Sequence, residues 1–275
     1  MTVREAFSLA RAKLSPFEAR TLMQELFGLD RLALLEKAAC VFPKESEEVL
    51  SDALRQREKG MPLQYILGRW TFMGHEFCVG QGVLIPRDDT EVVVERCLEM
   101  LKGNTDAKII DLCSGSGIIA ITLALAFPKA EITAVEKEEA AFSYLEKNIR
   151  RYALTNVRAV CGDIFDCHKD FDNGYFDAVV SNPPYIREEE LASLQTEVQF
   201  EPKTALCGGK DGLMFYRCIA ECWTDKLKSG GCMVLEIGET QADAVTFLME
   251  HSNMEKIRTH KDIQELDRVI SCTKK

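Results

Sequence analysis

The sequence predicts an α/β fold in which a seven-stranded, mostly parallel sheet with an antiparallel last strand follows a small N-terminal helical bundle. From residue 91 onward, short β-branched runs alternate with segments of helical period. This alternation is typical of a parallel sheet with helices on both faces. Before it, residues 1–75 repeat apolar side chains at spacings of three and four, as helices do.

The helical region carries its own start and stop signals. Ser15 stands before Pro16 and three residues before Glu18, which is the pattern of a helix N-terminus. Gly28 would end that helix. A further helix is expected over residues 46–59, where a serine opens the segment and a glycine follows it.

Residues 76–90 separate this bundle from the domain expected over residues 91–275. Two glycines and a proline interrupt its apolar residues. We therefore expect a short hairpin that links the two parts.

The sheet domain is expected to hold seven strands and five helices. The strands cover residues 108–112, 131–135, 157–160, 176–181, 232–237, 255–259 and 268–272. The helices cover residues 91–101, 116–126, 138–152, 212–227 and 241–251. Because about eight residues join the last two strands, too few for a parallel crossover, the last strand should run antiparallel.

Composition narrows the classes of function. The 34 basic and 44 acidic residues give a net charge of −10, and the whole excess lies in residues 61–275, with 24 basic and 34 acidic residues. We expect no direct contact with nucleic acid, because no sequence-wide basic footprint exists. No apolar run approaches the ~20 residues of a membrane span. The 11 cysteines include no C-x-x-C pair, which favours reduced thiols in the cytoplasm over a metal site.

A glycine loop follows the first expected strand of the sheet domain. Gly115 and Gly117 permit a tight turn and the close approach of a ligand. Glu136 ends the next strand, where an acidic residue can accept hydrogen bonds from two ribose hydroxyls. The dinucleotide fingerprint has a third glycine, and Ala120 stands in its place. A loop that only shapes the turn is the alternative interpretation.

Asp111 favours a cationic nucleoside ligand. A carboxylate at the end of this strand would repel a pyrophosphate, whereas S-adenosylmethionine carries a sulfonium, an ammonium and no phosphate. Asp163 could accept the adenine amino group and Phe165 could cover the ring, although taken alone they are more often turn and core residues. The residues expected to bind this cofactor are Asp111, Cys113, Ser114, Gly115, Ser116, Gly117, Glu136, Asp163, Phe165 and Asn182.

The most specific signal is the tetrad Asn182-Pro183-Pro184-Tyr185, which follows the strand over residues 176–181. The prolines fix two φ angles, remove two backbone donors and push Asn182 to an extended conformation. The amide oxygen of Asn182 and the carbonyl of Pro183 can then accept both hydrogens of a planar NH₂ group, and Tyr185 adds an aromatic wall. A loop that merely ends a strand is the alternative, but ligands of parallel sheets bind at this edge.

With its glycine loop and tetrad, the sequence resembles the amino-methyltransferases that use S-adenosylmethionine. Further segments resemble the release-factor glutamine methyltransferase family across nearly the whole chain. These segments are Pro62–Gly68, Val83–Glu91, Phe200–Pro202, Gly208–Gly212, Leu235–Gly238 and Asp267–Val269. The resemblance implies a Rossmann-like domain that transfers a methyl group to the side-chain amide nitrogen of the Gln in the Gly-Gly-Gln motif of class I peptide-chain release factors. It leaves S-adenosylhomocysteine as the product.

The resemblance also implies roles for individual residues. Asn182, Pro183 and Tyr185 would be catalytic, and Pro184, Arg87 and Thr90 would join them in binding the substrate. The helical residues 1–75 either pack on the rest of the chain or present a surface to a partner, and we expect them to dock the protein substrate. Three departures from the family pattern are Cys113-Ser114 in the glycine loop, Glu136 in place of Asp, and Asp88-Asp89 before Thr90.

Two other functions fit the same motifs less well. A nucleic-acid adenine N6-methyltransferase would also present a planar NH₂ group to the tetrad, but the acidic balance argues against it. A non-catalytic nucleotide-binding module would gain nothing from paired amide acceptors. We expect a monomer with no membrane contact and no bound metal.

Overall fold

The computed structural model describes residues 1–275 and divides into two compact units. The helical unit comprises Met1–Arg69 together with Gln195–Phe200. The sheet unit comprises Trp70–Leu194 and Glu201–Lys275. No helix is long and apolar enough to cross a membrane.

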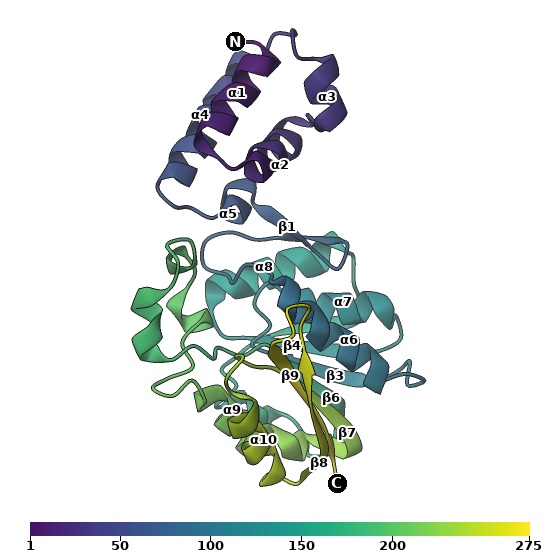
Figure 1. Cartoon of the computed structure of the whole chain (residues 1–275). Helices are drawn as coiled ribbons and strands as arrows, with labels where there is room; N and C mark the ends of the chain where they lie inside the picture. The colour runs from purple at the N-terminus through teal and green to yellow at the C-terminus, as the bar shows by residue number, and fades with distance from the viewer. The chain divides into compact units, whose positions relative to one another are not determined.

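The helical unit is built from five helices (Figure 1). These are α1 (Val3–Lys13), α2 (Pro16–Phe27), α3 (Arg31–Glu36), α4 (Lys44–Glu58) and α5 (Leu63–Leu67). Their apolar faces form one buried cluster, in which Leu22, Met23 and Leu50 have no exposed surface. The helical periodicity of the sequence therefore reflects a small core that these helices share.

The predicted ends of α2 are confirmed. The Ser15 side chain accepts from the Glu18 backbone N–H, and the Glu18 carboxylate accepts from that of Ser15, at 3.2 and 3.1 Å. Gly28 closes the helix with φ of 65°. The predicted start of the next long helix is wrong by two residues, because α4 begins at Lys44, directly after Pro43, which takes the N-cap position with extended backbone angles.

The segment Gln195–Phe200 packs on the helical unit through a central arginine. Arg57 pairs with both Glu18 and Glu197. Gly60 has φ of +90°, and a Cβ atom there would lie 2.8 Å from the Thr196 side chain. The absence of a side chain at Gly60 therefore allows the segment to approach.

The sheet unit contains the predicted seven strands in the order β5-β4-β3-β6-β7-β9-β8. They are β3 (Lys108–Leu112), β4 (Glu131–Glu136), β5 (Val157–Cys161), β6 (Phe176–Ser181), β7 (Leu227–Glu236), β8 (Met254–Lys261) and β9 (Asp267–Lys274). The pairs among β3 to β7 are parallel, and β9 runs antiparallel to both β7 and β8. The predicted antiparallel last strand is thus confirmed.

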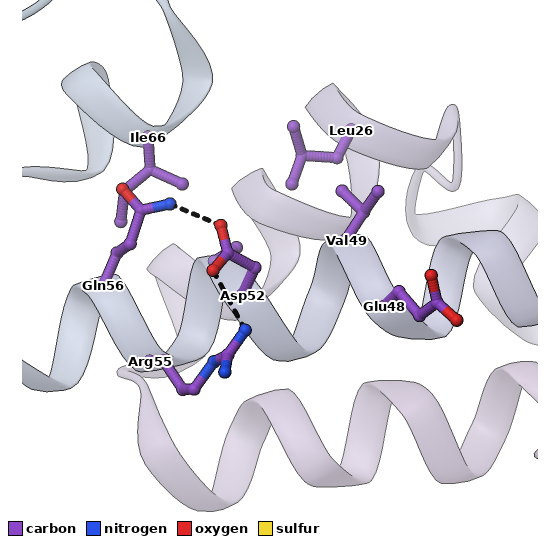
Figure 2. Close-up of a pocket in the computed structure, with 8 residues that line it drawn as sticks. Leu26, Glu48, Val49, Asp52, Arg55, Gln56 and Ile66 are labelled. Carbon is purple, nitrogen blue, oxygen red and sulfur yellow. Dashed lines mark hydrogen bonds and ion pairs between the residues drawn. The ribbon is translucent and has the colours of Figure 1, made fainter.

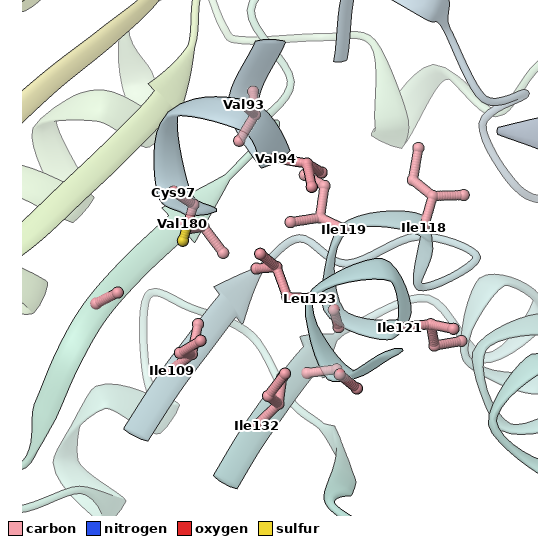
Figure 3. Close-up of a cluster of buried hydrophobic side chains, with 14 of the residues drawn as sticks. Val93, Val94, Cys97, Ile109, Ile118, Ile119, Ile121, Leu123, Ile132 and Val180 are labelled. Carbon is pink, nitrogen blue, oxygen red and sulfur yellow. The ribbon is translucent and has the colours of Figure 1, made fainter. Parts of the chain in front are cut away.

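Helices cover both faces of this sheet. On one face lie α6 (Glu91–Met100), α7 (Ile118–Ala126) and α8 (Glu139–Arg151), and on the other α9 (Met214–Cys218) and α10 (Ala242–Glu250). Figure 3 shows the first core, where side chains of α6 and α7 meet those of the strands. Along β7, Cys232 and Val234 face this core while Met233 and Leu235 face the other, as strand alternation requires.

Two further sequence predictions of local structure are wrong. The helix expected over residues 212–227 is α9 followed by a π-helical turn, Ile219–Trp223, and a 3₁₀ turn, Thr224–Lys226. The Thr224 hydroxyl donates to the Ala220 carbonyl at 2.9 Å, which competes with the regular helical pattern.

The hairpin expected over residues 76–90 lies earlier in the chain. Strands β1 (Arg69–Phe72) and β2 (His75–Cys78) form a two-stranded sheet. Met73 and Gly74 connect them with φ of 46° and 75°, the left-handed values that a tight hairpin turn needs. The residues from 79 to 87 form no strand, so the irregular part of this region follows the hairpin.

Candidate functional site

Four polar groups gather at the carboxyl edge of the sheet. The glycine loop follows β3, Glu136 ends β4, the tetrad follows β6, and Glu236 ends β7. Parallel neighbours bring their carboxyl ends to one edge, which is where α/β sheets bind ligands. The strand order therefore assembles a single candidate site from distant parts of the sequence.

The glycine loop turns sharply through left-handed backbone angles. Cys113, Gly115 and Gly117 have φ of 59°, 56° and 85°. A Cβ atom at Gly117 would lie 2.5 Å from Leu145 Cδ1, so a larger residue there would also have to displace the end of that side chain. At Gly115 the space is open, since the nearest atom would be 3.9 Å away, and the backbone angle alone favours glycine.

Glu136 binds the glycine loop from the neighbouring strand. Its two carboxylate oxygens accept from the backbone N–H groups of Gly115 and Glu138, both at 2.8 Å. The side chain is 8% exposed. Desolvation raises the pKa of Glu136, against the lowering effect of these backbone donors. The carboxylate is thus fixed in place next to the loop.

Asp111 lies beneath the loop with no exposed surface. One of its oxygens accepts from the Ala120 N–H at 3.2 Å, while Oδ1 has no hydrogen-bond partner. Desolvation raises the pKa of this carboxyl to about 8, and the charge of Glu136 adds to the shift. A buried carboxyl with an unpartnered oxygen is suited to a nearby positive charge, which fits S-adenosylmethionine.

Asp163 and Phe165 follow β5 on the same edge. Asp163 pairs with Lys137 at 2.9 Å and accepts from the Phe165 N–H at 3.1 Å. The ring of Phe165 is 36% exposed and meets the Phe215 ring edge-on, with centroids 5.3 Å apart. An aromatic face beside a carboxylate is therefore present where an adenine was expected.

The tetrad is anchored by a chain of three polar side chains, of which Asn182 is half-buried and the other two are buried. Asn182 Nδ2 donates to Thr90 Oγ1 at 3.1 Å, and Thr90 Oγ1 donates to Glu236 Oε2 at 2.6 Å. Tyr185 Oη donates to the other oxygen of Glu236 at 3.4 Å. Thr90 has no exposed surface and Glu236 is 1% exposed. Desolvation raises the pKa of Glu236 to about 7 although Thr90 opposes the shift.

The backbone of the tetrad is held by Gln241. Its Nε2 donates to the carbonyls of Tyr185 and Gly212, at 3.0 and 3.1 Å, and its Oε1 accepts from the Gly238 N–H at 2.9 Å. A Cβ atom at Gly208 would lie 2.8 Å from the Pro184 carbonyl. The glycine-rich segment after the tetrad is therefore packed directly on its backbone.

Arg87 and Glu201 form an ion pair in the same unit. Glu201 also accepts from the Ile85 N–H at 2.9 Å, and its side chain is 1% exposed, whereas that of Arg87 is 37% exposed. The structure thus brings Arg87 to a buried carboxylate. Thr90, which was expected to bind the substrate, has no exposed surface, and its hydroxyl accepts a hydrogen bond from Asn182.

Sequence reasoning gave no structural role to Glu236 or Gln241. A carboxylate at the end of an apolar strand, as at Asp111 and Glu136, was the available signal for Glu236. Gln241 lies in an ordinary polar turn before α10, and nothing in its local sequence distinguishes it.

Comparison with known proteins links both units to one family. The family described as PrmC N-terminal domain matches residues 3–68, and the family described as Methyltransferase small domain matches residues 89–205. A protein of Clostridium botulinum named release factor glutamine methyltransferase is 36% identical over 259 residues, which cover 94% of this chain and 91% of that protein. A Bordetella pertussis protein of the same name is 34% identical, covering 95% and 96%.

A solved structure shows the same fold at lower identity. It is the 16S rRNA N2 G1207 methyltransferase of T. Thermophilus in complex with AdoMet and guanosine, with a TM-score of 0.53 and 18% identity over 75% of this chain and 50% of that one. The full-length relatives are far more similar in sequence. This chain belongs to the release factor glutamine methyltransferase family.

Proposed function

We propose that the protein transfers the methyl group of S-adenosylmethionine to the side-chain amide nitrogen of the Gln in the Gly-Gly-Gln motif of class I release factors. The chief support is the shared sheet edge, where the Asn-Pro-Pro-Tyr tetrad follows β6 and the glycine loop follows the adjacent β3. The full-length relatives favour this function over methylation of adenine in nucleic acid.

The chemical difficulty is the amide nitrogen, whose lone pair is delocalised. The barrier of ~18–20 kcal/mol to amide rotation measures that conjugation. In the proposed mechanism, Asn182 Oδ1 and the Pro183 carbonyl accept hydrogen bonds from the two N–H groups of the glutamine amide and favour a partly pyramidal nitrogen. Pro184 contributes no N–H that would compete for these acceptors. The lone pair is then aimed at the methyl carbon.

When bound, S-adenosylmethionine supplies a methyl group on a positively charged sulfur. Transfer would form the nitrogen–carbon bond as the carbon–sulfur bond breaks, with S-adenosylhomocysteine as the leaving group, and the methylated amide would then lose one proton to water. No strong base is needed, because a protonated amide is a strong acid. Holding the two reactants in line provides much of the acceleration, since effective molarities reach ~10⁵–10⁸ M.

Residues on the cofactor side have separate proposed roles. Glu136 accepts the ribose hydroxyls, and the backbone of Cys113, Ser114, Gly115, Ser116 and Gly117 lets the cofactor approach. Asp111, buried next to the loop, balances the positive charge of the cofactor. Asp163 and Phe165 hold the adenine, while the Tyr185 ring forms a wall for the glutamine amide.

The helical unit is proposed to dock the release factor. It presents a hollow of about 410 Å³, called here the α4 hollow. Its lining residues are Leu26, Glu48, Val49, Asp52, Ala53, Arg55, Gln56 and Ile66. Figure 2 shows Val49 directed toward Leu26, while Asp52 bonds to Gln56 and Arg55. An apolar floor with charged residues beside it suits a protein surface. The proposed setting is the cytoplasm.

Labelled S-adenosylmethionine tests the proposal directly. Purified protein is offered a release factor, the same factor with the motif Gln changed to Ala, and duplex DNA. We expect label in the first substrate alone. Label that persists in the Ala variant, or that enters the DNA, would overturn the proposed function.

A variant of the tetrad tests the chemistry. Asn182→Ala should remove most turnover while S-adenosylmethionine binding largely survives, because the amide acceptor is lost and the loop after β3 is not. Turnover within a few-fold of the unmodified protein would contradict the role given to Asn182.

A further inference from the structure

We infer that Glu236, acting through Thr90, fixes which end of the Asn182 carboxamide faces the substrate, so that Oδ1 and not Nδ2 is presented. The catalytic role of this orientation rests on the proposed function. The arrangement of the three side chains can be tested without any substrate.

Counting hydrogens gives the direction of the chain. The Thr90 hydroxyl has a single hydrogen, and when Glu236 is ionised, above its pKa of about 7, the carboxylate 2.6 Å away can only accept it. The Thr90 oxygen then offers only lone pairs to Asn182, so the Asn182 atom 3.1 Å away must be the donor Nδ2. A flipped carboxamide would set two acceptors against each other with no hydrogen between them.

Burial gives this arrangement its strength. Thr90 has no exposed surface and Glu236 is 1% exposed, so water does not replace a lost partner cheaply. Tyr185 Oη and the neighbouring Arg268 also favour acceptor character at Glu236. Asn182 itself is partly exposed, as a group that meets a substrate must be.

Glu236 and Asn182 are therefore a matched pair. An aspartate at position 182 has no N–H and would need the single hydrogen of Thr90, which Glu236 already accepts. A glutamine at position 236 can reverse the chain, because its amide can donate to the Thr90 oxygen and release the Thr90 hydrogen toward position 182. The geometry thus predicts that the second change repairs the first.

The test compares Asn182→Asp, Glu236→Gln and the double variant, using turnover of the release factor and affinity for S-adenosylmethionine. We expect Asn182→Asp to lose about 100-fold in kcat and Glu236→Gln about 10-fold, as expected for unpaired buried groups. The double variant should regain about 10-fold over Asn182→Asp. Cofactor affinity should fall by much less than kcat in each variant, because the glycine loop and Glu136 are unchanged. A double variant no more active than Asn182→Asp would overturn the inference.

A second measurement needs no substrate and no activity. The side-chain amide protons of Asn182, assigned by their loss in Asn182→Asp, should exchange slowly with solvent because one is held by Thr90. Thr90→Val, which removes the hydroxyl, should abolish that protection. Thr90→Ser, which keeps the hydroxyl, should preserve it. Thr122→Val is the matched control, since Thr122 is buried in α7 and its hydroxyl has no partner.

Failure of the proposed function can be distinguished from failure of the inferred side-chain arrangement. If the protein does not methylate the release factor but the Asn182 protons respond as described, the proposed function fails and the side-chain arrangement stands. Unchanged exchange in Thr90→Val would overturn the inference whatever the substrate proves to be.

Discussion

The Gln241 side chain donates a 3.0 Å hydrogen bond to the carbonyl of Tyr185, 56 residues earlier in the chain. It also bonds to Gly212 and Gly238, so one side chain joins the tetrad to the segments after it and after β7. The tetrad is stiff because of its own prolines, but its position in the sheet unit depends on this distant residue.

We expect Gln241→Leu to lower the free energy of unfolding of the sheet unit by about 2 kcal/mol, because one buried and two half-buried backbone groups lose their partner. Both tryptophans, Trp70 and Trp223, belong to the sheet unit, so urea unfolding followed by their fluorescence reports on it. Gln24→Leu, at an exposed position of α2, is the control, with an expected change under about 0.5 kcal/mol. Equal losses in the two variants would contradict the anchoring role.

The contact of Gly212 with the tetrad can be separated from its backbone angle. Gly212 and Gly174 have φ of +75° and +66°, but a Cβ at Gly212 would lie 2.4 Å from the Tyr185 carbonyl, whereas one at Gly174 meets nothing within 4 Å. Alanine at either position costs about 1–2 kcal/mol for its left-handed angle. Only Gly212→Ala should also displace the tetrad and reduce kcat, by roughly 10-fold or more. Similar kcat values in the two variants would argue against the contact.

Glu136→Gln should weaken S-adenosylmethionine binding about 10- to 100-fold, measured by calorimetry, because a charged acceptor is lost. The new amide also points an NH₂ group at one of the two N–H donors that Glu136 now accepts. Glu131→Gln at the other end of β4 is the matched control, since that side chain is 69% exposed. A comparable loss in the control would remove the case for a specific contact.

The local motifs of the site were predictable from sequence, whereas the contacts that hold them were not. The tetrad and the glycine loop are continuous strings, and the alternation of strands and helices places both at strand ends. The bond from Thr90 to Glu236 spans 146 residues, so no local pattern reveals it before the order of the strands is known. The break after α9 was missed because residues 212–227 keep an otherwise helical pattern, although the chain turns π-helical at Ile219.

The α4 hollow gives a test of the docking role. Val49→Asp should reduce kcat/KM for a release factor about 10-fold, because it places a charge on an apolar contact. Affinity for S-adenosylmethionine and turnover of a short Gly-Gly-Gln peptide should not change. Val41→Asp is the control, since Val41 lies in the helical unit, outside the hollow, and is 82% exposed. If both variants lower kcat/KM equally, the hollow is not the docking surface.

Binding of S-adenosylmethionine should release a proton from Asp111. The pKa of this buried carboxyl is raised from 3.8 to about 8, chiefly by desolvation, so it is mostly protonated at pH 7 in the free protein. A positive charge nearby favours the carboxylate, so affinity should rise with pH toward about 8 and then level. Calorimetry at pH 7 in buffers of different ionisation enthalpy measures the released proton. Asp111→Asn should reduce that release, and Asp172→Asn on the exposed surface should not.

The raised pKa of Asp111 also determines the direction in which the free energy of unfolding changes with pH. Between the unfolded pKa of 3.8 and the folded value of about 8, the unfolded state binds fewer protons than the folded state at Asp111. Its contribution to the free energy of unfolding is therefore full below pH 3.8, falls as pH rises and is lost above about pH 8. Asp111→Asn should flatten the decline of stability across this window. An unchanged slope would show that Asp111 is ionised in the folded protein, and the expected proton release would fail with it.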